Sequence, residues 1–387
     1  MIVAILILSS LAFILVTVEE AEGYEEVLTR IIKTCAWDGD DPSSCYESEV
    51  PALYPGRPLP EVFDIIRDVV QKDSSYQFCH VLAHKIGERV VAEDPARWID
   101  AIPLNPRDGL CSNGFIHGVI GGRFRSEVLS DVMLNELIPD FSRACEARKD
   151  WKPSDLDRAI CYHGLGHLYD YITDANLGKA LSLCERTTSS QFRRVCVEGV
   201  FMQIYQPLEP DDYLLIERMA VRPGTTTVRQ FCAPFKDPEY VGACLRESWP
   251  FFRKDIMNGD GIEAFCSAQS NDELEEHCYR SAFTIVGRLA LATPESAALA
   301  CVHAPTGRQE MCYSVLAQTV LEEDRANVTG ALALCARAPS EIAGTCVQWL
   351  IHQASFIFGS NTEEYTQFCK ELAVTGPLRC PDVNRVR

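Results

Sequence analysis

Residues 328–358, VTGALALCARAPSEIAGTCVQWLIHQASFIF, contain the pattern that decides the fold of this chain. A short apolar stretch ends at Cys335, and a longer one opens at Cys346. From Cys346 to Phe358 apolar residues recur every three or four positions, which is typical of one face of an α-helix. The stretch therefore predicts one helix that ends at Cys335 and a second that starts at Cys346, with a loop that the two cysteines can bridge.

The same pattern recurs along the chain at a nearly fixed step. Ten or eleven residues separate the cysteines of each pair, and corresponding cysteines of successive pairs are mostly 34 or 35 residues apart. The six pairs are Cys184/Cys196, Cys232/Cys244, Cys266/Cys278, Cys301/Cys312, Cys335/Cys346 and Cys369/Cys380. Such a period is typical of stacked supersecondary units. We therefore predict an all-α fold, a disulfide-stapled α-solenoid of helix-loop-helix repeats of about 34 residues.

The full set of eighteen cysteines indicates an oxidising environment. The six remaining cysteines complete nine bridges if they pair as Cys35/Cys45, Cys79/Cys111 and Cys145/Cys161, although spacing alone leaves the first two of these pairings open. No C-x-x-C motif occurs, which argues against zinc ribbons and thioredoxin chemistry. We expect an extracytoplasmic protein that is secreted, periplasmic or displayed at the cell surface.

Helix pairs that are each clipped by their own disulfide resemble the cysteine-rich Sel1-like repeat proteins, which are relatives of tetratricopeptide arrays. The resemblance covers residues 140–387 and concerns architecture. The tetratricopeptide signature W-x2-L-G-x2-Y is absent, and the gap between paired cysteines is longer than that family uses. The resemblance implies an α-solenoid with a concave surface, and it transfers no catalytic residue.

The N-terminal residues have the composition of an export segment. Residues 1–18 are almost entirely apolar and are followed directly by Glu19 and Glu20. The run is just long enough to span a bilayer, but it lacks the basic region of an ordinary signal peptide. We predict a signal peptide or membrane anchor at 1–18, an acidic segment at 19–60, a His/Gly-rich helical domain at 61–206 and stapled helical repeats at 207–387.

The charge of the chain restricts its partners. Its net charge is −19, and no basic run is longer than Arg193-Arg194. Nucleic-acid binding requires a basic face, so this class of partner is excluded. Contact with a membrane is expected only through the N-terminal segment.

Five of the eight histidines lie within residues 80–167 and form the clearest chemical feature of the sequence. They are His80, His84, His117, His163 and His167. His80 and His84, like His163 and His167, are four residues apart, so each pair shares one face of a helix. Two imidazoles at this spacing are the arrangement that a metal-binding helix needs.

The position of each histidine relative to its cysteine gives an independent test. His117 and His167 both stand six residues after a cysteine, and His163 stands two residues after one. The same positions in later repeats are mostly polar, which predicts that these three histidines project onto a binding face. His80 and His84, at one and five residues after their cysteine, are expected to face the core if that cysteine starts a helix of the same kind.

Glycines accompany the histidines. They are Gly114, Gly118, Gly121, Gly122, Gly164 and Gly166. Each glycine in a helix interior costs about 1 kcal/mol relative to alanine, so a cluster indicates a close backbone approach, either of helix on helix or of helix on ligand. The simpler alternative is that these helices cross closely and that the histidines donate hydrogen bonds to carbonyl groups.

We predict that His163 and His167 bind a transition metal together with His117. His80 and His84, with Glu88 one turn further on, would complete this site or form a second one. Imidazole ligands suit Zn, Cu or Fe and do not suit Ca or Mg.

Whether the protein is an enzyme is left open by the sequence. If a metal were catalytic, Glu88, Asp170 or Glu198 could serve as the base. The sequence contains no H-E-x-x-H, G-x-S-x-G or P-loop motif. The alternative hypothesis is a non-catalytic extracytoplasmic scaffold that binds a protein or peptide partner on its concave face.

Overall fold

The computed structural model describes residues 22–36, 42–76, 78–125, 127–257, 259–290, 294–360, 362–375 and 379–380. Every regular element in these ranges is a helix, as the cysteine pattern predicts. The α-helices are α1 (Tyr24–Cys35), α2 (Pro42–Glu49), α3 (Leu59–Lys72), α4 (His80–Glu93), α5 (Trp98–Ala101), α6 (Gly114–Phe124), α7 (Asp131–Ala144), α8 (Asp155–Ile172), α9 (Leu177–Thr187), α10 (Ser190–Tyr205), α11 (Pro210–Glu217), α12 (Val228–Cys232), α13 (Pro238–Glu247), α14 (Arg253–Ile256), α15 (Gly259–Cys266), α16 (Asp272–Ala290), α17 (Pro294–Val302), α18 (Gln309–Glu323), α19 (Val328–Ala336), α20 (Ser340–Phe358) and α21 (Glu363–Thr375). Short 3-10 helices are η1 (Pro51–Leu53), η2 (Pro95–Arg97), η3 (Ile102–Leu104), η4 (Leu110–Asn113) and η5 (Trp249–Phe252). The predicted signal peptide or anchor at residues 1–18 lies outside the described residues.

All eighteen cysteines form disulfides, and the nine bridges are those that the spacing suggests. Each bridge joins one cysteine to the next cysteine along the sequence. Their Cα–Cα distances lie between 5.1 Å and 5.8 Å, within the range that an unstrained disulfide adopts. The bridges clip neighbouring helices together and leave the long-range contacts of the fold to packing.

In the five units with second cysteines from Cys196 to Cys346, the second helix starts earlier than the sequence pattern predicts. Helix α10 begins at Ser190 and α20 begins at Ser340, more than one turn before Cys196 and Cys346. The residues directly before these helices, Ser189 and Pro339, are in the non-helical conformations of N-caps and set the start of the helix. The bridges Cys184–Cys196 and Cys335–Cys346 therefore join the last turn of one helix to the second turn of the next.

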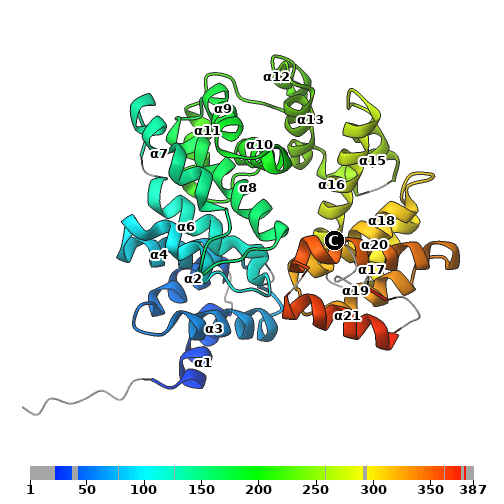
Figure 1. Ribbon diagram of the computed structural model, residues 1–387, viewed down its shortest axis with the longest axis horizontal. Helices are drawn as coiled ribbons and strands as arrows, with labels where there is room; N and C mark the ends of the chain where they lie inside the picture. The colour runs from blue at the N-terminus through cyan, green and yellow to red at the C-terminus, as the bar shows by residue number, and fades with distance from the viewer. Residues whose placement is uncertain are drawn as a thin grey trace, which may run out of the picture.

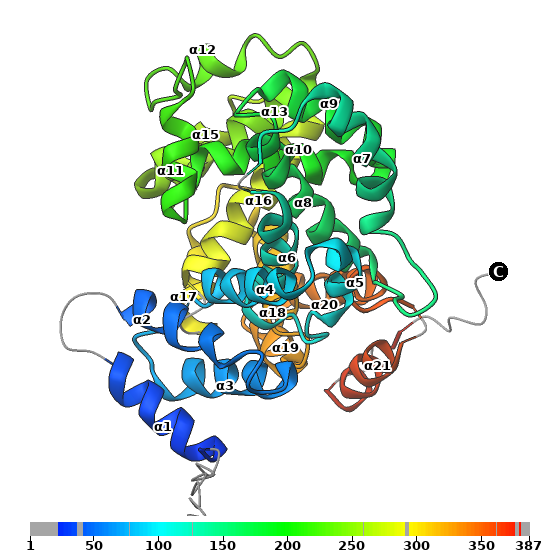
Figure 2. The ribbon, with the colours of Figure 1, turned by 90° about the vertical axis from the view of Figure 1, so that its left-hand side faces the viewer.

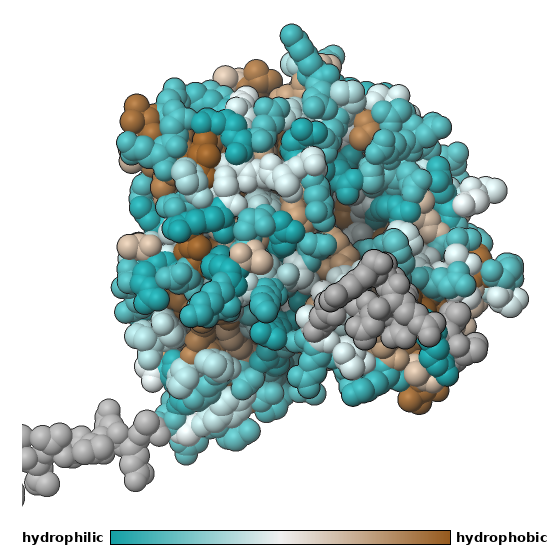
Figure 3. All heavy atoms as spheres, viewed as in Figure 1, coloured by the Kyte–Doolittle hydropathy of each residue, from teal (hydrophilic) through white to brown (hydrophobic). Residues whose placement is uncertain are grey.

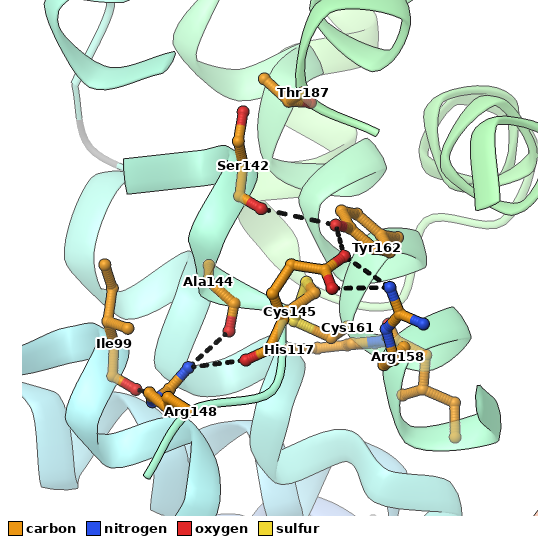
Figure 4. The surroundings of a disulfide bond; sticks show 12 residues. Ile99, His117, Ser142, Ala144, Cys145, Arg148, Arg158, Cys161, Tyr162 and Thr187 are labelled. Atoms are coloured by element: carbon orange, nitrogen blue, oxygen red, sulfur yellow. Dashed lines mark hydrogen bonds and ion pairs between the residues drawn. A yellow bond between two sulfur atoms is a disulfide. The ribbon is translucent and has the colours of Figure 1, made fainter. Parts of the chain in front are cut away.

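Polar contacts reinforce the bridge between Cys145 and Cys161, which joins the end of α7 to α8 (Figure 4). Arg158 donates to both carboxylate oxygens of Glu146, at 2.7 Å and 2.6 Å. The hydroxyl of Tyr162, which is 1% exposed, donates to the same carboxylate at 2.6 Å. Two side chains of α8 thus donate hydrogen bonds to the carboxylate of Glu146. These bonds hold the segment after α7 against α8.

Two pairs of helices cross at backbone contact, α4 with α6 and α8 with α10. A Cβ atom at Gly118 would lie 2.0 Å from the carbonyl oxygen of His84, and one at Gly199 would lie 2.1 Å from that of His163. No side chain fits at such a distance, so only glycine allows these crossings. Figure 2 shows α4, α6, α8 and α10 stacked in this order. The close approach expected from the glycines is therefore of helix on helix.

The C-terminal helices pack back onto the N-terminal half, where α20 contacts α8 (Figure 1). Arg325 donates from its side chain to Asp157 at 2.5 Å and from its main-chain N–H to the carbonyl of Asp108 at 3.1 Å. The hydroxyl of Ser112 donates to Glu323. These contacts join residues more than 160 positions apart in the sequence, as the separation of 168 for the first pair shows.

The face drawn in Figure 3 is mostly hydrophilic, with small hydrophobic groups scattered over it. Within the described ranges, no helix has both the length and the apolar character needed to cross a bilayer. The buried apolar residues form two clusters, one within residues 27–245 and one within residues 256–372 that also includes Leu156 of α8.

The glycine crossings give a test of this packing. Gly199→Ala should destabilise the fold by about 1–3 kcal/mol, because its methyl group would push α10 away from α8. The matched control is Gly344→Ala, at an exposed position of α20 with nothing within 4 Å of the added Cβ. That change should stabilise the protein by about 0.5–1 kcal/mol. Guanidinium unfolding with the bridges intact measures both changes, and equal effects of the two substitutions would contradict the crossing.

Candidate metal centre

The structure brings all five predicted histidines into one cluster with His117 of α6 at its middle. The centroid of its ring lies 5.3 Å from that of His80, 5.6 Å from His84, 5.8 Å from His163 and 5.5 Å from His167. Gly164 of α8 makes room for this ring, since a Cβ atom there would lie 2.6 Å from Cδ2 of His117. The sequence cluster is therefore a spatial cluster formed by three helices.

His80 and His84, which the sequence register placed toward the core, also join this cluster. Their ring centroids are 4.6 Å apart. Cys79 is the N-cap of α4, whereas the second cysteine of later pairs lies within its helix, as Cys196 does in the second turn of α10. The register of the later repeats therefore does not apply to α4.

The tightest group in the cluster is His80, His84 and His117, each of which offers one ring nitrogen within 4.8 Å of the others. This group is close enough to hold a metal ion. The trio predicted from the sequence, His117 with His163 and His167, shares only its central member with this group.

Hydrogen bonds to oxygen acceptors fix the tautomer of each of these three rings. His80 and His84 donate from Nδ1 to the carbonyl of Cys111 and the carboxylate of Glu209, both at 3.0 Å. His117 donates from Nε2 to a main-chain carbonyl of α8 at 3.2 Å. Because these oxygens only accept, the opposite nitrogen of each ring carries the lone pair when the ring is neutral. Nε2 of His84 and Nδ1 of His117 are buried and have no hydrogen-bond partner. Outer partners of this kind are typical of metal-ligating histidines.

Burial favours the neutral form of four of the five rings. Burial lowers the pKa of His80, His117 and His167 well below the usual range, and the neighbouring imidazoles lower it further. Burial also lowers the pKa of His163. A neutral imidazole is the form that binds metal ions, so no proton has to leave these four rings before ligation near pH 7.

A backbone turn of unusual conformation supplies one of the acceptors. Cys111, Ser112 and Asn113 of η4 have positive φ values of 53°, 52° and 59°. Left-handed conformations at non-glycine residues cost about 1–3 kcal/mol each and persist only where surrounding contacts impose them. Here the bridge from Cys79 to Cys111 and the hydrogen bond from His80 hold the turn. The strained turn thereby directs its carbonyl at the imidazole.

A small cavity adjoins the imidazoles, with about 40 Å³ of space for the centres of water molecules. A single water needs about 10–15 Å³ by this measure, so an ion and a bound water fit. Residues that line the cavity include His80, His84, His117, His167, Arg125, Tyr171, Met202, Gln203 and Asp212.

A buried carboxylate supports the cluster. Glu209, the N-cap of α11, is 3% exposed and accepts hydrogen bonds from His84, Lys85 and Arg125. Burial alone would raise the pKa of this acid, but the bonds from His84 and Arg125 outweigh burial and hold it well below its usual range. The cysteine and histidine patterns give no indication of this residue, because it lies between the pairs Cys184/Cys196 and Cys232/Cys244.

None of the three acids considered as catalytic bases lines the cavity. Glu88 pairs with Arg125 at 3.0 Å, and Glu198 accepts from Arg246 at 2.6 Å. Asp170 of α8 is 0% exposed, and neither of its carboxylate oxygens has a hydrogen-bond partner.

No family model, curated protein sequence or solved structure matches this chain.

Asp170 provides a test of the interior by pH. Burial raises its pKa well above the usual range. The unfolded chain therefore releases this proton at a lower pH than the folded one, and the fold loses about 1.4 kcal/mol per pH unit between the two pKa values. We expect Asp170→Asn to be more stable than the natural protein at neutral pH, with a gain that disappears near pH 3.5. Denaturant midpoints at both pH values check this, and a gain independent of pH would contradict it.

Proposed function

We propose that this chain is an extracytoplasmic metalloprotein that binds one transition-metal ion through His80, His84 and His117. The observation that carries the proposal is the convergence of three ring nitrogens within 4.8 Å of one another. Each ring also donates one N–H to a fixed oxygen acceptor. Only the unprotonated nitrogens are left for an ion to use.

The donor set indicates the class of metal. Three neutral imidazoles favour Zn, Cu or Fe over Ca and Mg, which prefer oxygen ligands. Three protein ligands leave a coordination position open, as in catalytic zinc sites. The cavity beside the rings would give a water or a small ligand access to that position. A metal bound there would act as a Lewis acid or lower the pKa of a bound water.

Two further parts of the proposal concern the architecture and the compartment. The nine disulfides support an oxidising environment, and export through residues 1–18 would deliver the chain to it. The succession of paired helices supports a superhelical array of repeats of the Sel1-like kind. A protein or peptide partner on the inner face of that array is the alternative function, and it requires no metal.

The test is the metal content of the oxidised, purified protein. After loading with Co(II) or Zn(II) and dialysis, we expect about one equivalent of tightly bound metal, with the visible spectrum of nitrogen-ligated cobalt. His80→Ala and His117→Ala should each lower the affinity at least 100-fold, because each removes a ligand. The control is His303→Ala, at an exposed position outside the cluster.

Circular dichroism and non-reducing peptide maps would establish that the variants keep their helices and bridges. A natural protein that retains no stoichiometric metal would overturn the proposal and favour the scaffold. The same conclusion would follow if His80→Ala and His117→Ala bound metal as well as the control.

A further inference from the structure

A second set of donor atoms lies next to the three-histidine group, between α8 and α10. The ring centroids of His163 and His167 are 4.7 Å apart. Met202 of α10 stands six residues after Cys196, the same register that His167 holds after its own cysteine. Its sulfur lies 3.2 Å from Nε2 of His163.

The contact between His163 and Met202 is unusual because neither atom has a proton to share. His163 donates from Nδ1 to the carbonyl of Val195 at 3.1 Å, so its Nε2 bears a lone pair. A thioether sulfur has only lone pairs to offer. With its proton directed at the carbonyl of Val195, the neutral ring presents no N–H to the sulfur. Two lone pairs that face each other in this way repel, and a cation bound by both atoms would remove that repulsion.

Hydrogen bonds also determine which ring nitrogen of His167 carries the proton. Its Nδ1 lies 3.0 Å from Oε1 of Gln203, and Nε2 of that amide donates to Asp212 at 2.7 Å. Because the carboxylate of Asp212 only accepts, the amide oxygen must face the histidine. The proton of His167 is therefore on Nδ1 and the lone pair on Nε2. Both His167 and Met202 line the cavity.

We propose that His163, His167 and Met202 form a second metal site that is selective for Cu(I). Two imidazoles and a thioether make a soft donor set, and thioethers select Cu(I) over Zn(II). The three-histidine group offers nitrogen alone, so the two neighbouring sites differ in softness. The inference does not depend on which ion, if any, the first site binds.

The alternative is that Met202 only fills space, as methionines often do in irregular interiors. Met202→Leu separates the two explanations, because leucine keeps the apolar volume and removes the sulfur. Met133→Leu is the matched control, since Met133 is exposed on α7, away from the cluster.

The experiment uses the full oxidised chain under anaerobic conditions. The protein is first saturated with Zn(II), and Cu(I) is then titrated in competition with a chromophoric Cu(I) chelator. We expect one further equivalent of Cu(I), with the zinc retained and a sulfur neighbour in the X-ray absorption spectrum of copper. Met202→Leu should lose this sulfur signature and bind Cu(I) roughly 10- to 100-fold more weakly, whereas Met133→Leu should behave as the natural protein.

Three results would overturn the inference. They are unchanged Cu(I) affinity in Met202→Leu, copper with only nitrogen neighbours, and Cu(I) that binds solely by displacing zinc. If the protein binds Cu(I) through sulfur but retains no Zn(II) or Co(II), the second site stands and the three-histidine proposal fails. The two proposals can therefore be judged separately.

Discussion

The arrangement of the whole cluster depends on the contact of glycine with a carbonyl oxygen at two helix crossings. Gly118 meets the carbonyl of His84, and Gly199 meets that of His163. The two crossings are equivalent, so the helix pairs α4/α6 and α8/α10 are two copies of one packing unit. In each copy the glycine contact brings the histidine of one helix to the face of the other. Any larger residue at the crossing would separate the helices, and the imidazoles with them.

The two copies carry different chemistry at matching positions. Counted from the crossing glycine, His117 in α6 corresponds to Glu198 in α10, and Gly121 corresponds to Met202. The first copy thus contributes nitrogen donors alone, and the second adds sulfur. His117 lies between the copies, within 5.8 Å of a ring from each by centroid distance. Two similar helix pairs with different donor atoms would allow two different metal ions to bind side by side.

Local patterns in the sequence predicted much of this structure, but they did not predict the contacts between distant segments. Cysteine spacing indicated seven of the nine bridges and left the pairing of Cys35, Cys45, Cys79 and Cys111 open. The glycines indicated a close backbone approach, because both signals lie within short stretches of sequence. The partners of the imidazoles could not be found in this way. Glu209 is 125 residues from His84, and the carbonyl of Cys111 owes its direction to a left-handed turn that spacing does not reveal. The start of each second helix was misplaced because the N-cap, and not the cysteine, determines it.

The order of the disulfides has a consequence for how the chain matures. Since every bridge joins a cysteine to its nearest successor, oxidation can proceed in step with the arrival of the chain in an oxidising compartment. A simple dithiol oxidase acting on consecutive thiols would make the native pairs, with little need for an isomerase to reshuffle wrong ones. In export from the N-terminus, Arg325 would follow both cysteines of seven of the nine bridges, so those bridges could form before Arg325 contacts the N-terminal half. Maturation would then end with the closing of an already stapled chain upon itself.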